Sequence, residues 1–193
     1  MAARRFTKAE LDSFRGSVVD DLVDERVRLL FVGINPGLWT AAVNAHFARR
    51  GNRFWPALHL AGITPHLVDA SSGLSDADRR TLLDAGVGIT NIVPMATARA
   101  DELTREELAA GAVRLEELVR RVRPAVVAVL GLTAYRQAFA DRAACRGRQE
   151  RDLAGVALWV LPNPSGLNAH DTVTTLAAAY AEAAREAGVL GAP

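Results

Sequence analysis

Two segments rich in proline and glycine carry the residue types best suited to a binding or catalytic site. They are Gly33-Ile-Asn-Pro-Gly37 and Pro162-Asn-Pro-Ser-Gly-Leu-Asn168. Proline fixes the dihedral angle φ and glycine allows close backbone approach, so both segments can hold main-chain amides rigidly toward a small planar ligand. Each segment alone is compatible with an ordinary turn. Their occurrence as a pair favours a shared site.

The sequence shows none of the common cofactor signatures. The first segment lacks the G-x-G-x-x-G spacing of dinucleotide-binding loops and the G-K-[ST] ending of a P-loop, so we expect no nucleotide cofactor. The four histidines have no HExxH or similarly tight spacing, so we expect no metal. The single cysteine, Cys145, excludes an intramolecular disulfide and a cluster held by four thiolates of one chain.

Composition limits the classes of protein further. The 193 residues are 50% hydrophobic and 23% charged, which excludes a disordered tail or a coiled coil. With 23 basic and 22 acidic residues the formal charge is +1, so any binding of nucleic acid must come from local patches. No apolar run resembles a signal peptide or reaches the length of a membrane helix, so we expect a cytoplasmic protein with no membrane role.

Four apolar runs predict the strands that position these segments. They span residues 28–34, 87–93, 125–130 and 156–161, and their hydrophobicity is continuous rather than alternating. Such runs indicate strands buried on both faces, and therefore a mainly parallel sheet between helical layers. The two proline-containing segments directly follow the first and last runs. Ligands bind beyond the carboxyl ends of strands in such α/β sheets.

Helical patterns and start signals separate the strands. Thr7 and Thr104 begin capping boxes, which predict an N-terminal helix at about residues 7–15 and a long helix that Pro124 closes. Further helices are predicted at residues 52–61, 76–85, 133–140 and 172–184. Irregular connections are expected at 36–51, 69–75 and 141–155, and the first is long enough to suggest a function.

Several motifs together resemble the mismatch-specific uracil-DNA glycosylase and thymine-DNA glycosylase family. The matching residues, in the family's order, are Gly33-Ile-Asn-Pro-Gly37, Phe47, Asn52-Arg-Phe-Trp55, Gly88-Ile-Thr-Asn91 and Asn163-Pro-Ser-Gly-Leu167. The resemblance extends from about residue 29 to 180. It implies a three-layer αβα fold with a central four-stranded, mainly parallel sheet, and a single glycosylase domain over residues 1–193 with its core at about 27–187.

The resemblance implies a division of roles around the target base. Asn35 resembles the residue that positions the attacking water, although a neutral amide cannot take the proton and chemistry should be slow. Phe47 resembles the floor on which the base stacks. Thr40 is implied to contact the nucleotide or shape the pocket, while amides near Ile34 and a hydrogen bond from Asn163 would offset charge on the leaving base. Without the resemblance, either asparagine could simply cap its own turn.

Gly166, Leu167 and Asn168 resemble the wedge that enters the base stack when a nucleotide is flipped out. The alternative is a leucine folded back onto the next helix. Ala169 and His170 depart from bacterial relatives, which commonly have an arginine two residues after the leucine. Met95 also stands where relatives tend to have arginine.

Basic residues near these motifs are the candidates for phosphate contacts. They are Arg49, Arg50 and Arg53, with Ser165 and amides at the start of the following helix as a further candidate. A second basic cluster consists of Arg142, Arg146, Arg148 and Arg151, and we interpret it as solvated surface.

The resulting hypothesis is a monomeric, monofunctional DNA glycosylase of base excision repair. It would flip out and hydrolyse uracil paired with guanine in double-stranded DNA and leave an abasic site, with thymine and ethenocytosine as further candidate substrates. Lys8 is the only lysine and lies in neither motif, which argues against a Schiff-base lyase step. The alternatives are a mismatch- or damage-sensing DNA-binding protein with negligible catalysis and a small-molecule α/β enzyme that uses the same loops.

Overall fold

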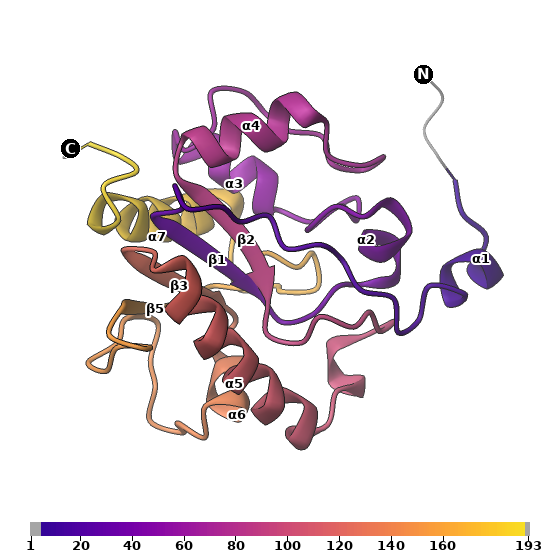
Figure 1. Ribbon diagram of the computed structural model, residues 1–193. Coiled ribbons are helices and arrows are strands. Elements are labelled where there is room, and N and C mark those ends of the chain that lie inside the picture. Colours follow the sequence, from indigo (N-terminus) through magenta and orange to yellow (C-terminus); the bar gives the residue numbers. More distant parts are fainter. Residues whose placement is uncertain (1–4, 192–193) are drawn as a thin grey trace.

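Four parallel strands and one short antiparallel strand form the central sheet (Figure 1). The computed structural model describes residues 5–191. The strand order is β2-β1-β3-β5-β4. The strands are β1 (Leu29–Gly33), β2 (Val87–Asn91), β3 (Val126–Leu130), β4 (Gly147–Arg148) and β5 (Ala157–Leu161). The four parallel strands are the four predicted apolar runs, which confirms the predicted α/β class.

The predicted strand number is wrong by one, because the sheet has five strands rather than four. The additional strand β4 pairs Gly147 with Val160 and Arg148 with Trp159, at the edge of the sheet. It lies within the segment 141–155 that was expected to be irregular. Since β4 has two residues and no apolar run, the hydrophobic pattern could not indicate it.

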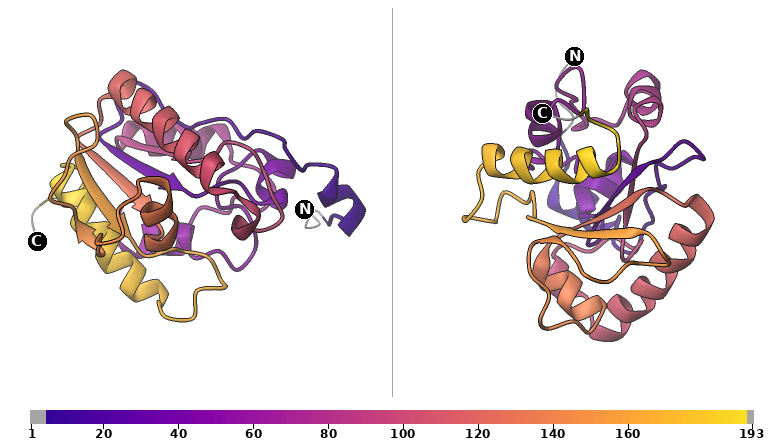
Figure 2. Two further views of the ribbon diagram at one scale, coloured as in Figure 1. Left: turned by 90° about the horizontal axis from the view of Figure 1, so that it is seen from below. Right: turned by 90° about the vertical axis from the view of Figure 1, so that its left-hand side faces the viewer.

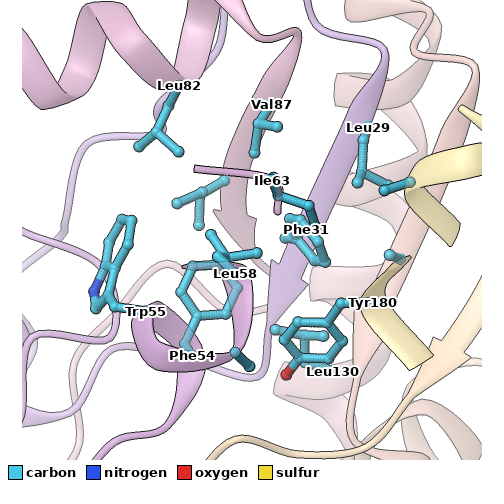
Figure 3. Packing of buried hydrophobic residues seen from close by; sticks show 14 of the residues in the cluster. Leu29, Phe31, Phe54, Trp55, Leu58, Ile63, Leu82, Val87, Leu130 and Tyr180 are labelled. Atoms are coloured by element: carbon cyan, nitrogen blue, oxygen red, sulfur yellow. The ribbon is translucent and has the colours of Figure 1, made fainter. Parts of the chain in front are cut away.

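Alternate residues of the parallel strands point into two different hydrophobic layers. Leu29 and Phe31 of β1 face one cluster, whereas Leu30 and Val32 face the other. The first cluster is covered by α3 (Phe54–Leu60), α4 (Asp76–Asp84) and α7 (Val173–Glu186), and Figure 3 shows its packing. The second is covered by α5 (Arg105–Val122) and α6 (Leu132–Ala138), so helices lie on both faces of the sheet (Figure 2). This burial on both faces explains the continuous hydrophobicity of the strands.

The helix start signals identify the helix beginnings more accurately than the ends. Thr7, Thr104 and Thr172 each form a capping box with the residue three positions later. The first helix, α1 (Lys8–Asp12), is nevertheless shorter than the predicted 7–15. None of its residues is fully buried, and within the helix only Leu11 packs against a small apolar cluster, so little packing supports a longer helix.

The segment 36–51 is not wholly irregular, contrary to the prediction. It contains α2 (Leu38–Val43), which begins after Gly37 without a side-chain cap and ends at Asn44 in the left-handed conformation, with φ of 46°. A short 3-10 helix at Ala100–Glu102 was also not predicted. Both elements are too short for a periodic apolar pattern to reveal them.

Candidate functional site

A cavity of about 470 Å³ lies at the carboxyl ends of the parallel strands. Its walls come from Gly33–Gly37 at the end of β1, Asn91 at the end of β2, Leu130 at the end of β3 and Asn163–Ser165 after β5. In the sheet, β2 lies on one side of β1 and β3 lies on the other, so the direction of the strand order changes at β1. A crevice that can bind a ligand forms at such a switch point, beyond the carboxyl ends of the strands. The fold thus brings the two proline-containing segments to one cavity.

The orientation of the Asn35 side chain is determined by three acceptors. Its Nδ2 donates to Thr97 Oγ1 at 2.7 Å and lies 3.2 Å from the Pro36 carbonyl and 3.3 Å from the Met95 carbonyl. Thr97 Oγ1 in turn donates to the Arg99 carbonyl at 2.7 Å, so this hydroxyl can only accept from Asn35. Because carbonyl oxygens cannot donate, the amide cannot be flipped. Oδ1 is therefore the atom that remains for a ligand or water in the cavity that Asn35 lines.

Phe47 lines the same cavity in a backbone conformation that bulky residues rarely adopt. Its φ is 54°, in the left-handed region, and such strain is concentrated at functional sites. Its ring stacks on Phe54 with centroids 4.0 Å apart and an interplanar angle of 26°. Phe54 and Trp55 are themselves buried in the core, as expected. One face of Phe47 is thus supported by the core while the residue still borders the cavity.

His46 and Asn91 also line the cavity. Neither was assigned a role from the sequence, although Asn91 ends the matching motif Gly88-Ile-Thr-Asn91. Burial lowers the pKa of His46 to about 4, so the ring is neutral at pH 7. His46 Nε2 lies 3.0 Å from the Asp20 carbonyl and therefore carries the proton. Nδ1 then accepts from Asn91 Nδ2 at 3.3 Å, which turns Asn91 Oδ1 toward Gly33. Two signals pointed to Asn91, its place in that motif and its position at the end of an apolar run.

We expect the neutral state of His46 to make the protein lose stability as the pH falls. The unfolded chain binds a proton at this histidine near pH 6.5, whereas the folded protein does so only near pH 4. The unfolding free energy should therefore fall by about 3 kcal/mol as the pH falls from 6.5 to 4. Denaturant titrations at several pH values would measure this slope.

The His46→Gln and His170→Gln variants separate this contribution from that of other groups. His170 is exposed, and its replacement should leave the slope unchanged. The His46→Gln variant should be less stable at pH 7 but flatter across the same window, because it has no neutral imidazole to protonate. Equal slopes for this variant and the parent protein would contradict the assignment.

The remaining base-binding candidates, Ile34, Thr40 and Asn163, also line the cavity. Asn163 Oδ1 accepts from the Ser165 amide at 2.9 Å, so its oxygen does cap its own turn. Its Nδ2 donor remains for a ligand. Thr40 is buried in α2 and can shape the wall.

Leu167 projects from the loop between β5 and α7 and also borders the cavity. Its relative exposure is 83%, so it is not folded back onto the next helix. The neighbouring Gly166 lies close to Gly51, since a β-carbon on Gly166 would be 2.9 Å from the Gly51 carbonyl oxygen. An extended apolar side chain thus stands at the rim of the cavity that contains Asn35.

The arginines near the cavity do not all have the environment expected of phosphate contacts. Arg49 and Arg50 are exposed. Arg53 is not free, because its guanidinium donates to the carbonyls of Ser165, Asn168 and Asp171. The assignment of Arg53 as a phosphate ligand is therefore corrected to a role within the loop that carries Leu167.

Ser165 also differs from expectation. The following helix α7 begins only at Val173, and Ser165 Oγ accepts from the Leu167 amide at 3.3 Å. The expected combination of Ser165 with helix N-terminal amides is not formed. In the second basic cluster, Arg148 pairs with Asp152 and Glu186, as a surface residue would, but Arg146 pairs with Asp171 beside the Leu167 loop.

Two classes of feature are absent from the described residues. Among residues 5–191, no three histidine, cysteine or acidic side chains gather as a metal site would require. Within the same range, every helix is too short or too polar to cross a bilayer.

Comparisons with known proteins bear on the family and the fold. The family model of the uracil DNA glycosylase superfamily matches residues 21–186. The fold is similar to a solution NMR structure of a protein from Methanosarcina acetivorans whose assignment as a uracil DNA glycosylase is provisional. That match has a TM-score of 0.61 at 16% sequence identity and covers 89% of this chain and 98% of that chain. The identity is low, so this likeness bears on the fold alone.

Proposed function

Because the chain belongs to the uracil DNA glycosylase superfamily, we propose that it is a monofunctional, mismatch-specific glycosylase that hydrolyses uracil from G·U pairs in duplex DNA. The observation that carries the proposal is the meeting of Asn35, Phe47 and Leu167 at one cavity. An amide that can hold water, an aromatic surface for a base and an exposed apolar wedge are the groups that base flipping followed by hydrolysis requires.

The hydrolytic water is held by Asn35. Thr97, Pro36 and Met95 occupy the Nδ2 side of the amide, so Oδ1 accepts a hydrogen bond from the water and orients it toward C1′ of the flipped nucleotide. The amide cannot accept the proton. The glycosidic bond must therefore be largely broken before the water adds, and the reaction depends on stabilising the leaving base.

Charge on the departing uracil is offset by donors on the other walls. Asn163 contributes Nδ2, because its Oδ1 is used within the turn. Main-chain amides around Ile34 and Phe47 supply further donors in the manner of an oxyanion hole, where one donor is worth about 3 kcal/mol. Asn91 Oδ1, oriented by His46, can accept the N3–H of neutral uracil.

The loop around Leu167 supports action on duplex DNA. Leu167 fills the gap left by the flipped nucleotide, and the main-chain carbonyls of the exposed residues Gly166 and Leu167 can accept from the N1–H and N2–H groups of the unpaired guanine. Strand cleavage is not part of the proposal. The chain's one lysine, Lys8, is in α1 and is not among the residues lining the cavity.

The proposal is tested by single-turnover base release from a panel of duplexes. We expect release of uracil opposite guanine and intact strands before alkaline treatment. The panel includes uracil opposite adenine, thymine and ethenocytosine opposite guanine, and single-stranded uracil. Binding to the G·U duplex with no base release would instead identify a damage-sensing protein, and indifference to Leu167→Ala would favour a small-molecule enzyme.

Salt should weaken DNA binding through the two free arginines beside the cavity. Arg49 and Arg50 are exposed, whereas Arg53 is held by three carbonyls. With two phosphate contacts, a plot of log affinity against log salt concentration should have a slope of about −2. Anisotropy with a non-cleavable G·U duplex measures the slope.

The double variant Arg49→Gln, Arg50→Gln provides the salt dependence with which that of the parent protein is compared. Its slope should approach zero, because the phosphate contacts are lost while the loop network of Arg53 is intact. An unchanged slope in this variant would place the phosphate contacts elsewhere on the protein.

A further inference from the structure

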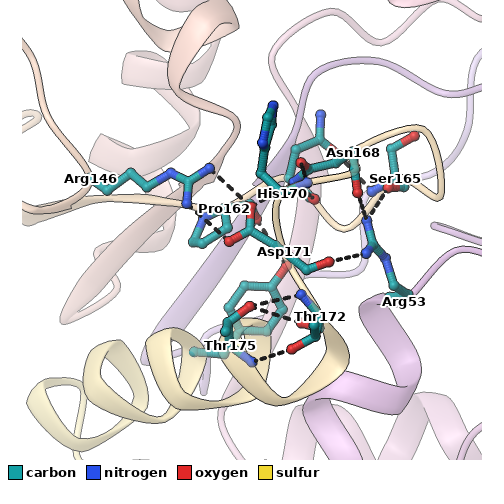
Figure 4. A network of polar contacts seen from close by, with 11 residues as sticks. Arg53, Arg146, Pro162, Ser165, Asn168, His170, Asp171, Thr172 and Thr175 are labelled. Atoms are coloured by element: carbon teal, nitrogen blue, oxygen red, sulfur yellow. Dashed lines mark hydrogen bonds and ion pairs between the residues drawn. The ribbon is translucent and has the colours of Figure 1, made fainter.

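A network of partly buried polar contacts holds the loop that carries Leu167 (Figure 4). It runs from Pro162 at the end of β5 to Thr172 before α7. Leu167 itself is exposed and cannot anchor the loop. The direction in which this side chain projects must therefore depend on residues elsewhere in the loop.

Arg53 binds the loop on both sides of Leu167. Its guanidinium donates to the carbonyls of Ser165 and Asp171 and, at 2.8 Å, to that of Asn168. The Arg53 amide also donates to the Pro164 carbonyl at 3.0 Å. One residue at the start of α3 thus binds the loop both before and after Leu167.

Asp171 closes the loop from the other side. Its carboxylate accepts from both terminal nitrogens of Arg146, at 3.0 and 2.9 Å, and from Asn168 Nδ2 at 2.7 Å. Asn168 Nδ2 also donates to the Asn163 carbonyl at 2.9 Å. The Asp171 side chain is only 5% exposed, whereas that of Arg146 is 48% exposed.

The ionised state of Asp171 is maintained by these partners. Burial opposes ionisation, but the hydrogen bonds from Asn168 and Arg146 outweigh it, so the pKa of Asp171 lies below 3.8. A planar guanidinium that binds both carboxylate oxygens fixes orientation as well as distance. The loop is consequently braced before DNA binds.

We propose that Asp171, joined to Arg146 and Asn168, is a positioning residue that holds Leu167 in the projecting orientation needed to enter the base stack. The inference rests on the proposed function. It also assigns Arg146, which the sequence placed on the solvated surface, the role of orienting the Asp171 carboxylate. Asp171 touches no substrate in this scheme. It acts by keeping the wedge preorganised, so that DNA binding does not have to order the loop.

The test uses Asp171→Asn, with Arg146→Gln as a second variant whose exposed side chain should not be required for folding. A duplex with a non-cleavable 2′-fluoroarabinouridine opposite guanine carries 2-aminopurine beside the uridine. Wild-type protein should raise the 2-aminopurine fluorescence when the wedge unstacks it. Both variants should lose most of this rise, as should Leu167→Ala.

Base release provides a second measurement, because a merely structural role of Asp171 would slow release from every substrate equally. For uracil opposite guanine in a duplex, Asp171→Asn should slow single-turnover release about tenfold, whereas release from an unpaired uracil in a bulge should change less than about twofold. In the Leu167→Ala background, Asp171→Asn should have no further effect on the duplex. Arg142→Gln removes a charge from the same segment without touching the loop and should behave as wild type.

Three results would overturn the inference. They are a full fluorescence rise with Asp171→Asn, equal slowing on the duplex and the bulge, and additive effects of Asp171→Asn and Leu167→Ala. A wild-type protein that raises the fluorescence but releases no uracil would contradict the proposed glycosylase activity. Loss of that rise in Asp171→Asn would still support the positioning role.

Discussion

Replacing Asn35 with alanine is expected to slow single-turnover release of uracil about a thousandfold, within the range that positioned catalytic groups supply. The Asn35 amide is held by Thr97 Oγ1 at 2.7 Å and by two carbonyls, so the position of Oδ1 is fixed before substrate binds. Alanine removes the acceptor that orients the water. Rapid-quench measurement of base release from a G·U duplex gives the rate.

The same variant should keep its affinity for a non-cleavable G·U duplex within a small factor. Leu167 and Arg49 lie on other parts of the cavity wall and are unchanged. A parallel loss of affinity and rate would mean that Asn35 holds the nucleotide rather than the water. A rate unchanged by the substitution would remove Asn35 from the mechanism.

Much of the fold could be predicted because its physical causes are local. The four parallel strands have continuous apolar runs, and all their residues are buried except Ala157 and Trp159 of β5, which are partly buried. Thr104 forms its capping box within four residues of sequence. By contrast, the two residues of β4 pair with β5 through backbone groups, and backbone pairing leaves no side-chain pattern in so short a strand.

Part of the candidate site could likewise be predicted from the sequence, and part could not. The convergence of the segments containing Asn35 and Leu167 follows from parallel strands, whose carboxyl ends share one edge of the sheet. The role of Arg53 could not be inferred, because an arginine beside a predicted DNA-binding pocket is equally suited to phosphate and to carbonyl oxygens. Arg53 binds carbonyls of residues that lie 112 to 118 positions later in the chain, and only the fold brings these residues beside it.

His46 and Asn91 illustrate a dependence on burial. A histidine in a loop is ordinarily a candidate for protonation near pH 6.5. In this protein burial and the Asp20 carbonyl fix it as a neutral acceptor for Asn91. Only the three-dimensional packing shows that these residues act as a pair.

Gly33 is a position where this packing leaves no room for a single methyl group. A β-carbon on Gly33 would lie 2.4 Å from Asn91 Oδ1 and 3.2 Å from the Phe47 ring. Asn91 cannot move freely, because its Nδ2 is bound to His46. We expect Gly33→Ala to displace Asn91, break that hydrogen bond and slow uracil release about a hundredfold, comparable with losing one preorganised polar contact.

A second substitution separates this steric effect from general misfolding. In the Gly33→Ala protein, Asn91→Ala removes the oxygen that the new methyl group strikes. Thermal unfolding should therefore show that Asn91→Ala costs less stability in the Gly33→Ala background than in the parent protein. Uracil release should stay low in the double variant, because the side chain that accepts the uracil N3–H is gone. Additive losses of stability would show that the methyl group and Asn91 do not meet, and that Gly33→Ala acts through other contacts, such as that with the Phe47 ring.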